Sequence, residues 1–149
     1  MNLEFYLIRM DRLFEDYAAD AQELERNRKP NELFGLKFGP TDDPRHDRFA
    51  DELAALLSDF VAEDPESGAV RAVIEKLYGA AKRYTEPKSA YWMLVAAQGL
   101  ITRLVPGLDR ADAAALAADY DKLWPRRARL PVQDEVLRQL KKAAKQPSP

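Results

Sequence analysis

The segment from Ala90 to Val105 (AYWMLVAAQGLITRLV) is a nearly unbroken apolar run around which the rest of the chain is organised. Its polar side chains are Gln98, Thr102 and Arg103. At helical spacing both faces of the run are apolar, and a helix of that kind is usually buried on both sides. We therefore expect the central helix of an all-α core, which is too short to span a bilayer. The small residues Ala96 and Gly99 would let another helix approach closely.

The same helix has a second interpretation, in which it carries an active site. Tyr91, Trp92 and Gln98 would line the pocket of a small helical enzyme if a cavity joined them. A role in the core explains the helix without any cavity, and we favour that interpretation.

The length and composition indicate one domain. A chain of 149 residues can bury a proper core, and we expect a single helical domain over residues 1–146 with a frayed tail at 147–149. The chain has no cysteine, which excludes disulfides and cysteine metal sites and favours a cytoplasmic protein. Charges interrupt the apolar start MNLEFYLIRMDRL, so we expect no signal peptide and no membrane partner.

Capping signals predict the other helices. Proline fits the first helical position because no amide donor is needed there, and a preceding aspartate can cap the helix. Asp43-Pro44 and Asp64-Pro65 are such pairs, and Thr85-Glu86-Pro87 opens the central helix. Asp109, with Asp112 three residues on, resembles a capping box. The helices expected besides the central one run over about residues 3–26, 44–63, 65–84, 109–124 and 132–145.

The first helix carries an apolar stripe whose steps of three and four residues are typical of a coiled-coil seam. Its members are Leu3, Leu7, Met10, Phe14, Tyr17, Ala21 and Leu24. Ile8 and Leu13 widen the stripe, which favours a helix packed on its own domain. A dimer through this helix remains an alternative.

A long connection at residues 27–43 (NRKPNELFGLKFGPTDD) combines turn residues with apolar side chains. Long loops in compact domains are often functional. Phe34 and Phe38 would either plug one end of the core or form a lid or a surface for a partner protein.

Three prolines show a weak periodicity. Pro44, Pro87 and Pro131 lie 43 and 44 residues apart, and each opens a predicted helix. This is close to the length of a two-helix solenoid repeat. We predict an all-α single-domain bundle of about six helices with a long apolar loop after the first. The alternative is a short α-solenoid of two-helix repeats.

Charge is distributed unevenly along the chain. Residues 1–65 carry 8 Lys/Arg and 16 Asp/Glu, residues 66–121 carry 7 of each, and residues 122–149 carry 8 and 2. This gradient would either draw the last helix onto the first or present a basic arm to an acidic partner. We favour the first of these two interpretations.

The sequence offers little for catalysis. The single histidine, His46, has aspartates as its sequence neighbours, and we expect it to be an exposed, titrating surface group. Di-metal helical bundles need repeated Glu-x-x-His motifs, which this chain lacks. No phosphate-binding glycine loop is present either. We therefore predict no catalytic residue, no metal site and no cofactor.

A basic turn, WPRRAR at residues 124–129, is a candidate binding site. Arg126, Arg127 and Arg129 suit phosphate or carboxylate groups, and Trp124 could stack on a ligand. The alternative has Trp124 in the core and the arginines paired with the acidic first half. Nucleic-acid binding is not favoured, because the whole chain is slightly acidic.

Taken together, these observations favour a non-catalytic cytoplasmic module that binds another protein or itself, so a homodimer is one of the expected states. The binding residues that we consider are Phe34, Phe38, Trp124, Arg126, Arg127 and Arg129. The alternatives are binding of an anionic ligand or nucleic acid through the turn at 124–129, and the small helical enzyme described above.

Overall fold

A computed structural model describes residues 2–26 and 44–146, and every regular element in them is a helix. The predicted loop with Phe34 and Phe38, and the predicted tail at 147–149, lie outside the described residues. The α-helices are α1 (Leu3–Arg26), α3 (Pro44–Ala62), α4 (Ser67–Arg83), α5 (Lys88–Ala97), α6 (Ile101–Leu104), α7 (Arg110–Leu123) and α8 (Pro131–Lys145). Short 3₁₀ turns are η2 (Gln98–Leu100), η3 (Val105–Gly107) and η4 (Arg126–Ala128).

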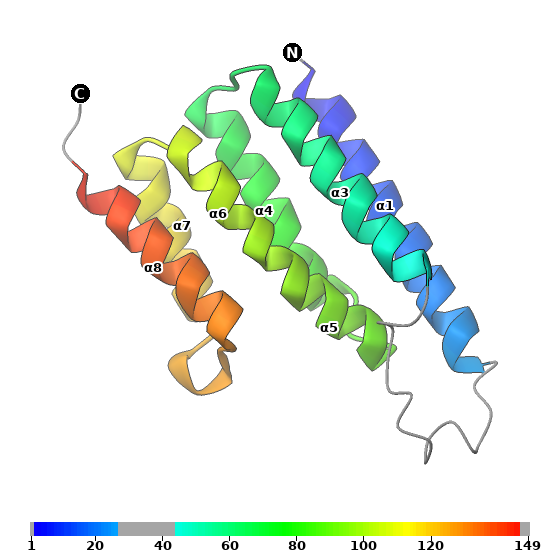
Figure 1. Ribbon diagram of the computed structural model, residues 1–149. Helices are drawn as coiled ribbons and strands as arrows, with labels where there is room; N and C mark the ends of the chain where they lie inside the picture. The colour runs from blue at the N-terminus through cyan, green and yellow to red at the C-terminus, as the bar shows by residue number, and fades with distance from the viewer. Residues whose placement is uncertain (1, 27–43, 147–149) are drawn as a thin grey trace.

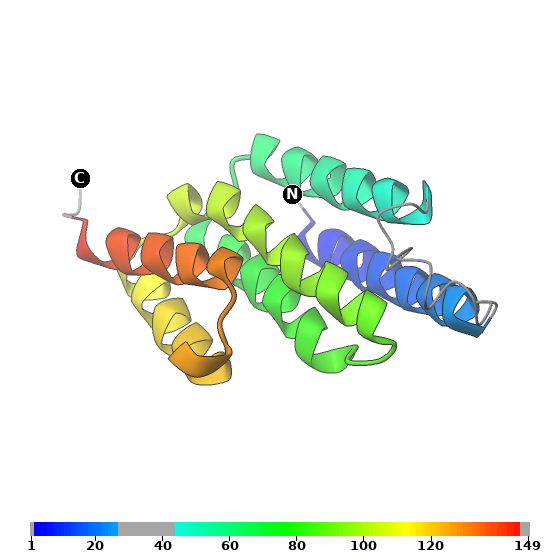
Figure 2. The same ribbon diagram turned by 60° about the horizontal axis from the view of Figure 1, so that its bottom comes forward.

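The described helices form three antiparallel pairs that lie side by side in two layers (Figures 1 and 2). The pairs are α1 with α3, α4 with the rod made of α5 and α6, and α7 with α8. Helices α1, α4 and α7 form one layer, and α3, α5–α6 and α8 form the other. All of these helices contribute to one continuous apolar core. The predicted all-α, single-domain helical bundle is confirmed.

The three periodic prolines mark equivalent places in this array. Pro44 and Pro131 are the first residues of α3 and α8, and Pro87 directly precedes α5. These three helices form the second layer, and they start at the same end of the molecule (Figure 1). The third residue of each is buried, and these residues are His46, Ala90 and Gln133. The period of 43 to 44 residues therefore corresponds to one helical pair.

The predicted apolar stripes point into the core. On α3, the buried residues include Phe49, Leu53, Leu56, Leu57 and Phe60. On α1, Met10, Phe14, Tyr17 and Ala21 are buried, but Ile8 is 52% exposed. The stripe of α1 is therefore narrower than predicted, because Ile8 lies outside the arc that α3 and α4 cover.

The central helix differs from its prediction in two ways. It is a rod in which a 3₁₀ turn, η2, joins α5 to α6. Its second face is not fully buried, since Trp92 is 50% exposed and Ala96 is also exposed. The array has two layers, so no third layer covers that face. Gly99 does allow a close approach, because a Cβ built there would lie 3.3 Å from Cγ2 of Val132 on α8.

Asp64 ends α3 and does not cap α4. Its φ of 51° is left-handed, and its amide donates to the Val61 carbonyl at 3.0 Å. Aspartate tolerates this conformation better than most residues. Helix α4 begins two residues later than predicted, at Ser67.

Helices α1 and α8 lie at opposite edges of the array (Figure 1). The favoured interpretation of the charge gradient, in which the last helix is drawn onto the first, is therefore wrong. Two acidic residues of α1 pair instead with α4: Asp11 lies 2.9 Å from Lys76, and Glu15 lies 3.7 Å from Arg83. The acidic and basic ends of the chain stay apart in the folded molecule.

Candidate functional site

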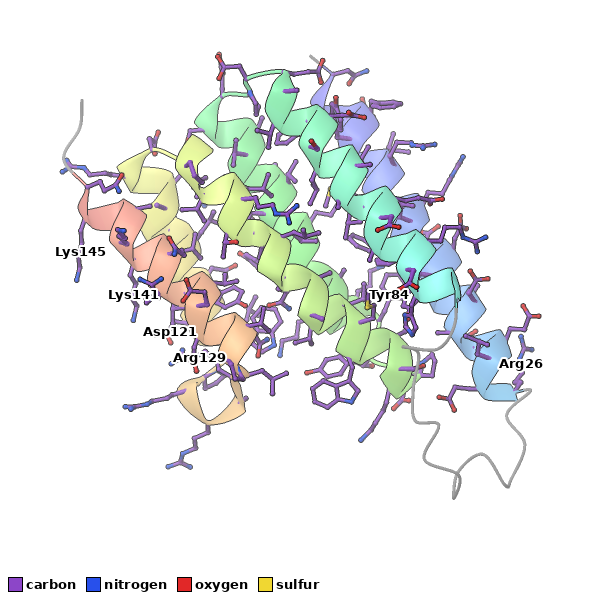
Figure 3. The ribbon with its side chains drawn as sticks, viewed as in Figure 1. Arg26, Tyr84, Asp121, Arg129, Lys141 and Lys145 are labelled. Carbon is purple, nitrogen blue, oxygen red and sulfur yellow. The ribbon has the colours of Figure 1, made fainter. Side chains whose placement is uncertain are left out.

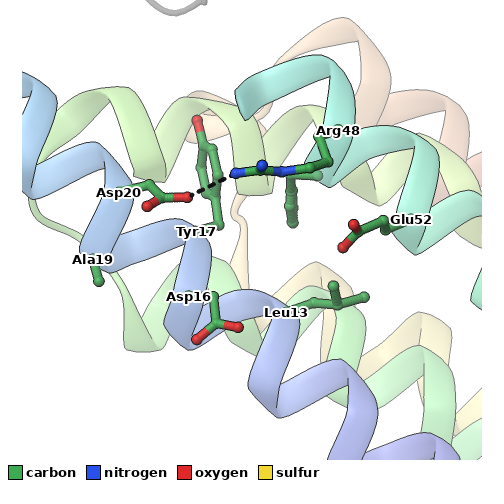
Figure 4. Close-up of a pocket in the computed structure, with 8 residues that line it drawn as sticks. Leu13, Asp16, Tyr17, Ala19, Asp20, Arg48 and Glu52 are labelled. Atoms are coloured by element: carbon green, nitrogen blue, oxygen red, sulfur yellow. Dashed lines mark ion pairs between the residues drawn. The ribbon is translucent and has the colours of Figure 1, made fainter. Parts of the chain in front are cut away.

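A pocket of about 450 Å³ opens between α1 and α3 at one edge of the array. We call it the α1–α3 pocket. Figure 4 shows the side chains that α1 and α3 direct toward it. Its residues are Leu13, Asp16, Tyr17, Ala19 and Asp20 from α1, and Arg48, Phe49 and Glu52 from α3. They recur at steps of three and four residues, which places them on one face of each helix.

The pocket opens on the side of α1 that faces away from α4. Residues 13, 16 and 20 lie on the opposite side of an α-helix from residues 11 and 15. Asp11 and Glu15 are the residues that pair with α4. No other described helix therefore covers the α1–α3 pocket.

The floor of the pocket is aromatic. Tyr17 and Phe49 stack with ring centroids 4.5 Å apart and an interplanar angle of 23°. Both side chains are buried, so the floor belongs to the hydrophobic core. Phe14 packs on Phe49 from beneath, with ring centroids 6.2 Å apart. These contacts between α1 and α3 fix the spacing of the pocket walls.

His46 lies beside this floor and is buried, with 4% of its surface exposed. Its ring packs on Tyr17, whose hydroxyl lies 2.5 Å from Nδ1. The prediction of an exposed surface histidine is therefore wrong. Burial lowers the pKa of His46 below its usual value of 6.5, while the charge of Asp47 opposes the shift. A neutral ring suits this position, because Nδ1 can accept a hydrogen bond from the tyrosine hydroxyl in one tautomer and donate one to it in the other.

The rim of the pocket is acidic. Asp16, Asp20 and Glu52 carry three negative charges, and Arg48 carries one positive charge. Arg48 lies 3.6 Å from Asp20, as the dashed line in Figure 4 marks. Within residues 2–26 and 44–146, no ion pair engages Asp16 or Glu52. The rim thus presents net negative charge above an aromatic floor.

The opposite edge of the array is basic. Arg138, Lys141 and Lys145 recur along α8 at steps of three and four and are exposed. Figure 3 shows Lys141 and Lys145 at the edge formed by α7 and α8. Arg138 pairs with Glu135 on the same helix at 2.6 Å. Neither lysine has an ion-pair partner in the described part of the chain. We call these three residues the α8 stripe.

The predicted turn at 124–129 is divided between core and surface. Trp124 is 2% exposed, and Lys82 lies over its ring at 5.1 Å. Arg129 pairs locally with Asp121 at 2.6 Å and with Asp134 at 2.9 Å. Of the four predicted binding residues in this turn, only Arg126 and Arg127 are exposed, so a binding role for the turn would rest on those two residues.

The structure does not bring the three residues of the predicted enzyme pocket together. The rings of Tyr91 and Trp92 make an edge contact at 5.1 Å, near the start of α5. Gln98 is fully buried, where its Oε1 accepts a hydrogen bond from the Tyr120 hydroxyl. None of these residues lines the α1–α3 pocket.

A second, smaller hollow lies between α3 and α6, with a volume of about 150 Å³. Its walls are mainly apolar, and Arg103 is its one charged residue. The residues that line it are Ala54, Leu57, Ser58, Val61, Leu100, Arg103 and Leu104. Nothing in its charge or shape indicates what would occupy it.

The sequence analysis proposed no site at Asp16, Asp20, Arg48 or Glu52. A signal was present, because Asp16 and Asp20 are four residues apart beside the apolar stripe of α1. Their joint placement with Arg48 and Glu52 depends on how α3 packs on α1, which spacing within one helix does not specify.

The described residues contain neither a membrane-spanning helix nor a cluster suited to a metal ion. No helix among them is both long and apolar enough to cross a membrane. No group of three histidine, cysteine, aspartate or glutamate side chains in these ranges is arranged to hold a metal ion.

Comparisons with known proteins found no matching family model, no matching curated protein and no matching solved structure. A function must therefore be inferred from the geometry of this chain.

Proposed function

We propose that this protein is a non-catalytic, cytoplasmic interaction module that binds a basic segment of a protein partner in the α1–α3 pocket. The observation that carries the proposal is a pocket that no other described helix covers, with the carboxylates Asp16, Asp20 and Glu52 on its rim. Lysine and arginine side chains fit such a site, because their apolar stems can lie against Leu13 and Ala19 while their charged ends reach the carboxylates.

The geometry of the rim supports a helical or extended basic segment. Asp16 and Asp20 are four residues apart on α1, about 6 Å along its axis. Glu52 faces them from α3, so a segment lying between the helices would meet carboxylates on both sides. Charges at such a rim mainly steer association and set its salt dependence.

The test measures binding of a fluorescent, lysine-rich helical peptide by anisotropy at low ionic strength. We expect binding to weaken about 2- to 30-fold in the variant Asp16→Asn/Glu52→Gln, because exposed ion pairs are each worth ~0.2–1 kcal/mol. The matched control, Asp51→Asn/Glu86→Gln, removes the same charge at exposed sites outside the pocket and should retain wild-type affinity.

Equal weakening in both variants would mean that net charge alone attracts the peptide, and the pocket assignment would fail. A peptide of the same length with its lysines replaced by glutamine should not bind. Circular dichroism of each variant confirms that the helices are retained.

A further inference from the structure

The two outer edges of the helical array carry opposite charges. The α1–α3 pocket has three carboxylates and one guanidinium on its rim. The α8 stripe has three basic side chains at the other edge. These edges belong to the first and last helical pairs, so no single molecule can bring them together (Figure 1).

The two surfaces also match in spacing. Lys141 and Lys145 are four residues apart on α8, as Asp16 and Asp20 are on α1. Each interval corresponds to about 6 Å along a helix axis. A copy of α8 that lies along the pocket would therefore bring its two lysines to a rim where Asp16 and Glu52 have no ion pair within the described residues.

The internal architecture shows that such stacking is compatible with the fold. Within one molecule, each helical pair packs against the next in the same two-layer arrangement. In repeat proteins the outer face of a terminal unit is normally a polar cap. Here the outer face of the first pair is polar, but the α1–α3 pocket makes it hollow, which differs from a simple solvated cap.

We propose that the partner bound in the α1–α3 pocket is the α8 stripe of a second copy of this chain. The inference rests on the proposed function, because it names the partner of that same site. The two surfaces are different and lie on opposite edges, so the contact is head-to-tail. A contact of this kind adds further copies unless its rotation closes a ring.

The first measurement is the weight-average mass of the full chain by light scattering, over a range of protein concentrations and at two salt concentrations. At low salt the mass should rise above twice the 16.9 kDa of one chain without levelling off at the dimer. At high salt it should fall toward the monomer, because exposed charges are screened.

Two neutralised variants then test which surfaces meet. Asp16→Asn/Glu52→Gln removes the two rim carboxylates that have no ion pair in the described residues, and Lys141→Gln/Lys145→Gln removes the two lysines of the stripe. Each variant alone should be largely monomeric. Mixed in equal amounts, they should form a heterodimer and nothing larger, because each supplies the one surface that the other has lost. The control Lys88→Gln/Arg103→Gln, at exposed sites on α5 and α6, should associate like wild type.

Three results would overturn the inference: a wild-type chain that stays monomeric at low salt, a mass that levels off at the dimer, or association that survives in either neutralised variant. If the basic peptide still binds in the pocket of a monomeric wild-type chain, the proposed function stands and only the identity of the partner is wrong. If neither the peptide nor a second copy binds, both proposals fail.

Discussion

The Tyr17 hydroxyl on α1 lies 2.5 Å from Nδ1 of His46 on α3, so a buried polar contact joins the two helices that form the α1–α3 pocket. Tyr17 also stacks on Phe49, which is the next buried residue along α3 after His46. One tyrosine thus contacts α3 through both its ring and its hydroxyl. These two contacts hold α1 and α3 together at the base of the pocket.

The buried state of His46 predicts a pH dependence of stability. Because burial lowers its folded pKa below 6.5, the unfolded chain binds a proton more readily than the folded chain. The free energy of unfolding is therefore fully retained above pH 6.5 and falls as the pH drops below 6.5, until the folded pKa is reached. One group can contribute a slope of at most about 1.4 kcal/mol per pH unit.

The measurement is urea unfolding of wild type and His46→Gln between pH 7.5 and pH 5.5. His46 is the only histidine, so the variant should show a nearly flat profile from pH 7 to pH 6. A variant with the same slope as wild type would show that another group titrates in this range.

Ser67, the first residue of α4, predicts a measurable link between α4 and α7. Its hydroxyl donates to Asp112 at 2.5 Å and accepts from the Asp109 amide at 2.8 Å. The hydrogen bond from Ser67 is the largest cause, and that from Arg71 the next, of a lowered Asp112 pKa. Ionised Asp112 therefore contributes stability above its ordinary pKa of 3.8, and this is lost as the pH falls through the lower folded pKa.

Ser67→Ala should raise the pKa of Asp112 toward its ordinary value and lower the free energy of unfolding by about 1–2 kcal/mol. An NMR titration of the carboxyl carbon and urea unfolding measure the two effects. Ser58→Ala, an exposed serine in α3, serves as the control and should change neither. If the pKa of Asp112 were the same in Ser67→Ala as in wild type, the Ser67 hydroxyl could not be a cause of its lowered value.

Substitutions at two glycines should have opposite effects on the free energy of unfolding. A Cβ at Gly79, inside α4, would meet no atom within 4 Å. Gly79→Ala should therefore stabilise the fold by about 0.5–1 kcal/mol through helix propensity. A Cβ at Gly99 would lie 3.3 Å from Val132, and the larger Gly99→Val should destabilise by about 1–3 kcal/mol through overpacking. Thermal unfolding of both variants tests the contrast, and a stabilised Gly99→Val would refute the close approach of α8.

Local sequence signals predicted most of the helices because caps and apolar periodicity act within a few residues. The bounds of α1 are those expected. The side chain of Asp109 accepts a hydrogen bond from the Asp112 amide at 2.8 Å, and Trp124 lies in the core. The weaker capping signal at Asp64 gave a wrong prediction, because the left-handed backbone of Asp64 ends α3. Sequence alone does not show which of two adjoining helices such a residue serves.

The α1–α3 pocket could not be predicted from such local signals, because it depends on contacts between residues that are distant in sequence. His46 is flanked by aspartates in sequence, yet in the fold it is buried against Tyr17, which is 29 residues away. Likewise, the charge gradient is visible in the sequence, but its meaning depends on the order of the helical pairs. That order puts α4, and not α8, beside the acidic α1.

A buried polar cluster between the second and third helical pairs gives the last prediction. The Tyr120 hydroxyl donates to Oε1 of Gln98, and Nε2 of Gln133 lies 3.5 Å from the same oxygen. Nε2 of Gln98 has no hydrogen-bond partner in the described part of the chain. An unsatisfied buried polar atom costs about 1–3 kcal/mol. The folded state therefore already bears a cost of this kind at the Gln98 amide.

Tyr120→Phe should lower the free energy of unfolding by about 1–3 kcal/mol, because it removes the strongest partner of a buried carbonyl. In a Gln98→Met background the same change should cost much less, since the carbonyl is then absent. A double-mutant cycle by urea unfolding should give a coupling energy of about 1–2 kcal/mol. Simple additivity of the two changes would show that Tyr120 stabilises the core by packing alone, and the hydrogen bond would then contribute nothing to stability.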